Sequence, residues 1–125
     1  MVAPIICYEV EFPEMVRQLK MRGTDVVLVV TAVEKGYSGE FLTSCLIRTR
    51  AFENNVYVAY CNRVGDEGGM HFLGRSLLAS PMGEVVAQLS DAPGELHGLE
   101  CCRDKIKEAE VAHPFIADLR QSIFK

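Results

Sequence analysis

The chain has 125 residues, of which 49% are apolar and 24% are charged, and its formal net charge is −4. A chain of this length folds as one domain or as part of a larger one. Its acidic balance offers no basic surface for nucleic acid or anionic lipid, and no apolar run reaches the roughly 18 residues that span a bilayer. Residues 1–8 carry no basic leader segment, so we expect a cytoplasmic protein that binds neither nucleic acid nor membranes.

The first predicted unit is a short apolar strand over residues 2–7, followed by a helix over Pro13–Arg22. Proline suits the first helical turn, Glu14 complements the positive end of the helix dipole, and Gly23 provides the C-terminal stop. Residues 25–30 then form a continuous β-branched run, which is typical of a strand covered on both faces.

The rest of the chain alternates between apolar and turn-forming segments. The predicted elements are a loop at 34–39, a helix over 41–54, a strand over 56–61, a loop at 65–70, two strands over 72–80 and 84–89 flanking a turn at 81–83, a strand over 95–100 and a helix over 102–109. The opening order strand–helix–strand–helix–strand predicts an α/β sheet with crossover helices and a hairpin extension.

Cysteine and histidine placement predicts neither a disulfide framework nor a metal site. Five cysteines are an odd number without Cys-x-x-Cys spacing, which favours a reducing compartment. The three histidines are scattered singly, so we expect no metal and no cofactor. Cys45, Cys61, Cys101 and Cys102 are expected to be small buried side chains.

Cys7 stands at the predicted turn between the first strand and the first helix. Such an elbow presents a side chain on a tight turn beside the backbone N–H groups of the helix start. A cysteine after two isoleucines is also compatible with a small buried side chain. Because Glu9 and Glu11 disfavour a nearby thiolate, a nucleophilic Cys7 needs a cation close by, and the local sequence offers none.

Three predicted strands end in polar or reactive residues, at 7–9, 31–34 and 61–63. In open α/β sheets the functional crevice lies at the carboxyl ends of the strands. We therefore expect these three segments to converge on one site.

Five segments stand out in order along residues 5–110. They are Ile6 to Glu9 with Phe12-Pro13-Glu14, Thr31-Ala32, Arg48 to Asn54, Tyr57 to Gly65, and Phe72 to Ser76 with Pro81 to Glu84. Their order and spacing resemble those of the nitrilase superfamily, the carbon–nitrogen hydrolases. Among the branches, the chain is most similar to the amidases that cleave small amides.

The resemblance implies that Cys7 is the nucleophile and that the Tyr8 backbone N–H is half of an oxyanion hole. In this family a cysteine attacks an amide or nitrile carbon, ammonia or an amine leaves, and water hydrolyses the resulting thioester. A glutamate acts as general base and acid, and a lysine stabilises the oxyanion. The implied substrate is a small amide.

The resemblance also assigns supporting roles. The residues expected to line the substrate pocket are Glu9, Thr31, Ala32, Val33 and Glu34. The residues expected to give structural support are Arg50, Glu53, Asn54 and Asn62. Glu9 stands where the family commonly has aspartate, so the hydrogen bonding of the elbow departs from the family pattern. Val30 replaces a usual proline and Val33 a frequent aromatic, so the shape of the pocket departs from it as well.

The implied fold is α/β, the C-terminal half of a nitrilase-type α-β-β-α sandwich with one mixed sheet and helices on one face. The family's glutamate and lysine precede the cysteine, whereas six residues precede Cys7 here. We therefore expect residues 1–125 to be a partial domain without its N-terminal half, inactive alone unless Glu34 and Lys35 substitute for the missing pair. Its inner sheet face should be open to water, and it should pair with that N-terminal half or with another copy of the chain.

Two other functions stay open at this stage. One is a non-catalytic subunit or interaction module that keeps the fold, and the other is a thiol-based redox protein that uses Cys7. If adding the N-terminal half of the fold restores turnover that depends on Cys7, the chain is a hydrolase and not a non-catalytic module. Cys7 labelling no faster than that of Cys45 argues against the second.

Overall fold

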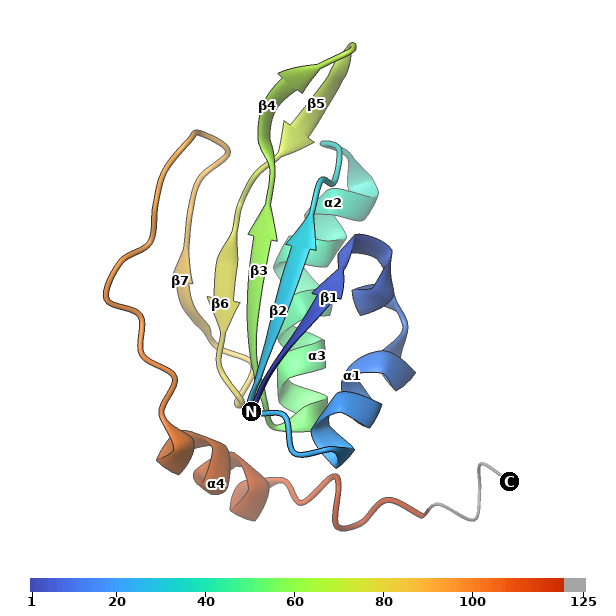
Figure 1. The fold of residues 1–125 in the computed structure, drawn as a ribbon, viewed down its shortest axis with the longest axis vertical. Helices are drawn as coiled ribbons and strands as arrows, with labels where there is room; N and C mark the ends of the chain where they lie inside the picture. The colour runs from blue at the N-terminus through green and yellow to red at the C-terminus, as the bar shows by residue number, and fades with distance from the viewer. Residues whose placement is uncertain (121–125) are drawn as a thin grey trace.

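The computed structural model describes residues 1–120, which form one mixed five-stranded sheet with helices on one face (Figure 1). The strands are β1 (Val2–Ile6), β2 (Val26–Thr31), β3 (Tyr57–Asn62), β6 (Leu77–Ala79) and β7 (Val85–Gln88). They are ordered β1-β2-β3-β6-β7, with β1, β2 and β3 parallel and β6 and β7 antiparallel to their neighbours. The predicted α/β class and the mixed sheet are thus confirmed.

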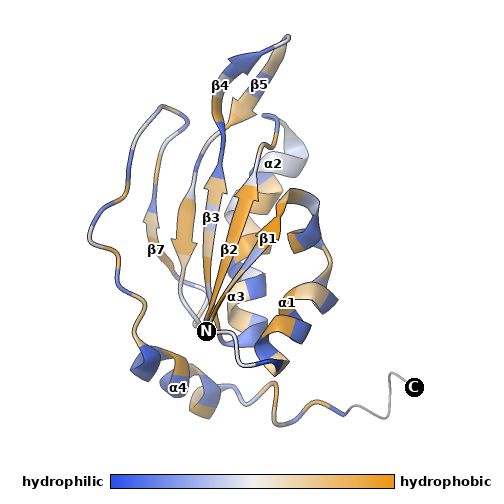
Figure 2. Ribbon diagram, in the orientation of Figure 1, coloured by the Kyte–Doolittle hydropathy of each residue, from blue (hydrophilic) through white to orange (hydrophobic). Residues whose placement is uncertain are grey.

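The helices between the parallel strands cover one face of the sheet, whereas the last helix, α4 (Arg103–Ala112), follows the final strand and packs on the opposite face. The covering helices are the 3₁₀ helix η1 (Cys7–Glu11), α1 (Pro13–Met21), α2 (Tyr37–Phe41), the π-helical turn η2 (Leu42–Leu46) and α3 (Ile47–Asn54). The core between this helical layer and the sheet is apolar, and it contains Val16 of α1, Val27 and Val29 of β2, and Ile47 and Ala51 of α3. Figure 2 shows the strongest apolar colouring on β1 and β2.

Helix α1 follows the sequence prediction to within one residue. Proline occupies the first turn, and Gly23 adopts a φ of 89° just after the helix end, a conformation that suits glycine. The next helix begins at Tyr37 rather than 41, so the predicted loop at 34–39 is shorter than expected.

The buried face of the second helical segment differs from the prediction. Cys45 is exposed, whereas Ile47, Arg50 and Asn54 are buried. A π-helical turn takes in one residue more than an α-helical turn, which rotates the following side chains relative to those before it. Arg50 and Asn54 tolerate burial because their donor groups are hydrogen-bonded.

Residues 65–70 are not a simple loop. They lie within a hairpin made of β4 (Val64–Glu67) and β5 (Met70–Leu73), which projects from the carboxyl end of β3 in Figure 1. Gly68 and Gly69 both have positive φ at its turn, so the Gly-Gly pair was the hairpin signal. The predicted strand over 72–80 is broken between β5 and β6.

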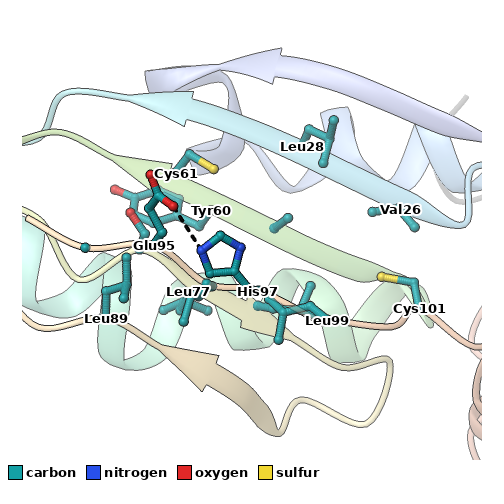
Figure 3. Close-up of a pocket in the computed structure, with 15 residues that line it drawn as sticks. Val26, Leu28, Tyr60, Cys61, Leu77, Leu89, Glu95, His97, Leu99 and Cys101 are labelled. Carbon is teal, nitrogen blue, oxygen red and sulfur yellow. Dashed lines mark ion pairs between the residues drawn. The ribbon is translucent and has the colours of Figure 1, made fainter.

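The strand predicted over 95–100 is absent, because this segment runs as irregular chain. Part of it lines a pocket of about 550 Å³ on the sheet face opposite α1 and α3, where Figure 3 shows Leu28, Cys61 and Leu99. The predicted final helix is confirmed and extends to Ala112, and its Ile106 packs on the same face. None of the helices formed by residues 1–120 is long and apolar enough to cross a membrane.

The sheet face away from α1 and α3 is apolar and largely uncovered. The strand register places Pro4 beside Leu28, and Ile6 beside Val30 and then Cys61. Ile6 is 69% exposed and Val30 is 59% exposed, while Val27 and Val29 on the other face are fully buried. The expectation that residues 25–30 are covered on both faces is therefore wrong for this chain, and the expected open inner face is confirmed.

Candidate active site

Cys7 lies at the elbow between β1 and η1, and the backbone there is strained. Its φ is +47°, a left-handed conformation that costs a residue with a side chain of the order of 1 kcal/mol or more. Strain of this kind is retained mainly where surrounding contacts impose it, often at functional sites. The Cys7 side chain is half-buried and its thiol is free.

Tyr8 and Glu9 form the first turn of η1. The Glu9 carboxylate accepts a hydrogen bond of 2.6 Å from the Ile6 N–H, so it closes the turn around Cys7. The Tyr8 ring is exposed and packs edge-on against Phe12. The Tyr8 backbone N–H belongs to the first helical turn, where N–H groups have no acceptor within the helix.

Thr31 ends β2 directly beside the elbow. Its hydroxyl donates a hydrogen bond of 3.1 Å to Cys7 Sγ, and the side chain is buried. Tyr60 of β3 is also buried nearby, although sequence analysis did not select it. The sequence did indicate its orientation, because side chains two residues apart in a strand share a face. Tyr60 therefore lies with Val58 on the helix-covered face, near the end of the strand.

The Asn62 side chain links two loop segments by hydrogen bonds, one after β2 and one after β5. Its Oδ1 accepts a hydrogen bond of 2.8 Å from the Val33 N–H, and its Nδ2 donates one of 2.8 Å to the Gly74 carbonyl. The end of β3 therefore holds both the segment after β2 and the segment after the hairpin. Ala32 in that first segment is exposed, and Val33 is half-buried.

We predict that Asn62→Ala lowers the free energy of unfolding by about 2 kcal/mol, because a donor and an acceptor lose their buried partner. Urea denaturation of the chain measures the change. Gln88→Ala is the matched control, since it removes an exposed amide from β7 and should change stability by less than about 0.5 kcal/mol. Equal effects of the two substitutions would contradict the role of Asn62 as a tie.

Arg50 fastens α3 to the turn that carries Cys7. Its Nε donates to the Val10 carbonyl at 2.9 Å, and one terminal nitrogen donates to the Glu11 carbonyl at 2.7 Å. The other terminal nitrogen pairs with the Glu53 carboxylate at 3.0 Å. Asn54 acts within α3, where its Nδ2 donates to the Arg50 carbonyl.

Glu34 and Lys35 lie along the hairpin rather than against Cys7. Glu34 forms a β-bridge with Phe72, and the Lys35 N–H donates to the His71 carbonyl. Lys35 Nζ lies 3.8 Å from Asp91, and both side chains are exposed. Within residues 1–120, no hydrogen bond or ion pair joins either side chain to Cys7.

The other four cysteines are exposed, which overturns the expectation that they are buried. Cys61 faces outward on β3 because the strand alternates and its odd positions lie on the open sheet face. Cys101 and Cys102 precede α4 in irregular chain. In the described part of the chain, no three His, Cys, Asp or Glu side chains group as metal ligands.

Residues 1–109 match the family model described as carbon–nitrogen hydrolase. The chain belongs to the carbon–nitrogen hydrolase family. It is 43% identical over 83 residues to a hydrolase in the pqqF 5′ region of Pseudomonas protegens, covering 66% of this chain and 28% of that protein. It is 38% identical over 87 residues to the omega-amidase YafV of Escherichia coli, covering 69% of this chain and 32% of YafV.

A solved carbon–nitrogen hydrolase fold matches nearly the whole chain. An amidase variant from Nesterenkonia sp. AN1 superposes with a TM-score of 0.79 at 32% identity, covering 98% of this chain and 43% of the amidase. That structure shows acrylamide added to the amidase's active-site cysteine. The chain thus spans less than half the length of these three relatives.

Proposed function

We propose that this chain carries the nucleophile of an amidase that hydrolyses a small amide. Cys7 Sγ attacks the amide carbon and forms a C–S bond. The C–N bond then breaks, ammonia or an amine leaves with a proton, and a thioester remains. Water cleaves the thioester, which releases the carboxylic acid and regenerates the thiol. The carrying observation is the strained elbow that presents Cys7 beside the Thr31 hydroxyl at the end of the parallel strands.

The elbow also supports a role for the Tyr8 backbone N–H in stabilising the oxyanion. When Sγ attacks, negative charge develops on the substrate oxygen, and a fixed N–H donor lowers the energy of that state. Hydrogen bonds around the turn fix the position of the Tyr8 N–H. Glu9 closes the turn from one side, and Arg50 holds the Val10 and Glu11 carbonyls from the other.

We propose that the general base and the oxyanion-stabilising lysine come from outside these 125 residues, so that the chain alone is inactive. Within residues 1–120, no hydrogen bond or ion pair joins a carboxylate or ammonium group to Cys7. The backbones of Glu34 and Lys35 pair with the hairpin, and the Lys35 ammonium lies near Asp91. Loss of a general base costs about 10²–10⁴ in rate, and loss of one oxyanion donor costs about 10²–10³. Either loss leaves little turnover.

The open sheet face supports a second protein layer as the partner of this chain, either an N-terminal half of the same fold or another copy. Two adjacent apolar rows cross β1 and β2 on this face. One row is Pro4 beside Leu28, and the other is Ile6 beside Val30. Contiguous apolar surface of this kind is costly in water and marks an interface.

We expect Val30→Lys to weaken self-association of the isolated chain by about tenfold or more, because a buried unpaired charge costs more than 1.4 kcal/mol. Analytical ultracentrifugation at micromolar concentration measures this. Val111→Lys is the control, since Val111 is 84% exposed on α4 and is not part of the two apolar rows on β1 and β2. An unmodified chain that is monomeric at micromolar concentration and melts in a sharp cooperative transition would contradict the proposal.

The free thiols support the cytoplasm as the compartment. All five cysteines are unpaired, including Cys7 at the proposed active site. A reducing compartment keeps such thiols in the form that nucleophilic attack requires.

A chimera tests the proposed function. In it, residues 1–125 replace the aligned part of the Nesterenkonia amidase, and ammonia release from a small aliphatic amide is measured. We expect turnover by the chimera and none by the isolated chain. A folded chimera without turnover would favour a non-catalytic module instead.

A further inference from the structure

Two buried hydroxyl groups lie beneath the Cys7 elbow on the helix-covered side of the sheet. Thr31 is 8% exposed, and its hydroxyl donates to Cys7 Sγ at 3.1 Å. Tyr60 is 1% exposed, and its hydroxyl oxygen has no well-formed hydrogen bond within residues 1–120. A buried polar atom without a partner costs about 1–3 kcal/mol, so the position calls for a reason.

The protonation of Tyr60 defines what it can do. Burial raises the pKa of Tyr60 to about 12, negative charge on Cys7 and Glu11 raises it further, and the Thr31 hydroxyl opposes the shift. At neutral pH the Tyr60 hydroxyl therefore keeps its proton and serves as a donor, not as a base. The strand register pairs Tyr60 with Val29, which places Tyr60 diagonally beside Thr31 on the same face of the sheet.

Thr31 is the one polar residue of β2, whose sequence is Val-Val-Leu-Val-Val-Thr. Valine has nearly the same shape, so packing alone does not require the hydroxyl. The hydroxyl points at Cys7 Sγ, and the branched side chain restricts its rotation, which fixes the direction of the hydrogen bond.

We propose that Thr31 and Tyr60 are positioning residues that aim the Cys7 sulfur at the amide carbon and stabilise the negative charge that develops on it during attack. Thr31 already donates to Sγ, and the unpartnered Tyr60 hydroxyl turns to donate to Thr31 Oγ1 as negative charge develops on the sulfur. Hydrogen bonds to a charged acceptor are stronger than those to a neutral one, and bonds in a chain reinforce each other. Neither hydroxyl gives up its proton. The inference rests on the proposed role of Cys7 as the nucleophile.

The test follows alkylation of the 125-residue chain by iodoacetamide across a range of pH, with each cysteine resolved by peptide mass spectrometry. We expect Thr31→Val to slow Cys7 alkylation at pH 7 about tenfold and to move its pH profile upward. Thr31→Ser keeps the hydroxyl and should stay within about twofold of the unmodified chain, and Tyr60→Phe should slow the reaction about threefold. Cys45 is the internal reference, and its rate should not change.

Equal Cys7 rates in the unmodified chain, Thr31→Val and Tyr60→Phe would overturn the proposal. Circular dichroism checks folding, and Thr31→Ala replaces Thr31→Val if the latter does not fold. In the chimera, Thr31→Val should lower kcat about tenfold with KM little changed. A failure of the proposed function is detected by a different experiment. Turnover by a chimera that lacks Cys7 would show that Cys7 is not the nucleophile, whatever the alkylation rates are.

Discussion

Replacement of Cys7 by alanine is expected to lower kcat of the chimera on the order of 10⁶-fold, to the background rate. The loss is this large because no other group can form the thioester. The amide can then be hydrolysed only by direct attack of water, assisted by the remaining oxyanion-stabilising hydrogen-bond donors. Ammonia release from a small aliphatic amide measures it.

Cys45→Ala is the matched control, since Cys45 is exposed on η2 and, within residues 1–120, no hydrogen bond joins its thiol to the elbow. Its kcat should stay within about twofold of the parent chimera. Comparable losses in the two variants, or an active Cys7→Ala variant with normal folding, would contradict the assignment of Cys7 as nucleophile.

Replacement of Arg50 by methionine is expected to lower the free energy of unfolding by about 3–4 kcal/mol. The substitution leaves the Val10 and Glu11 carbonyls and the Glu53 carboxylate without their donor. Lysine at this position supplies a single ammonium in place of the planar fork, so Arg50→Lys should recover only part of the loss. Urea denaturation of the chain measures both.

Arg48→Met controls for the removal of an arginine from the same helix. Its Nε makes one hydrogen bond, to the Gly83 carbonyl, and the residue is exposed. We expect a loss of about 1 kcal/mol or less. An Arg50→Met variant as stable as Arg48→Met would show that α3 does not hold the elbow in the way described.

Sequence analysis predicted correctly those helices and strands whose local sequence preference matches their environment in the fold. Pro13 and Gly23 bracket α1, and the β-branched runs form the central parallel strands. Prediction was wrong where distant contacts decided the outcome. Leu99 lies in a stretch with strand-like composition, but it rests against the open sheet face as irregular chain.

The candidate site was predictable only in part. The elbow made Cys7 visible, because a strand, a cysteine and a helix start follow one another within a few residues. Tyr60 was missed because a tyrosine in an apolar strand is ordinarily a core residue. Only the strand register, which pairs Tyr60 with Val29, places it on the same sheet face as Thr31. The burial of Arg50 was likewise invisible, since it depends on carbonyls about forty residues away.

The most direct measurement is acid quenching of the chimera during turnover of a small aliphatic amide, followed by pepsin digestion and mass spectrometry. We predict the acyl group of the substrate on the peptide that contains Cys7, released by hydroxylamine as a thioester is. Steady turnover with no acyl group on that peptide, or with the acyl group on another residue, would contradict the proposed mechanism.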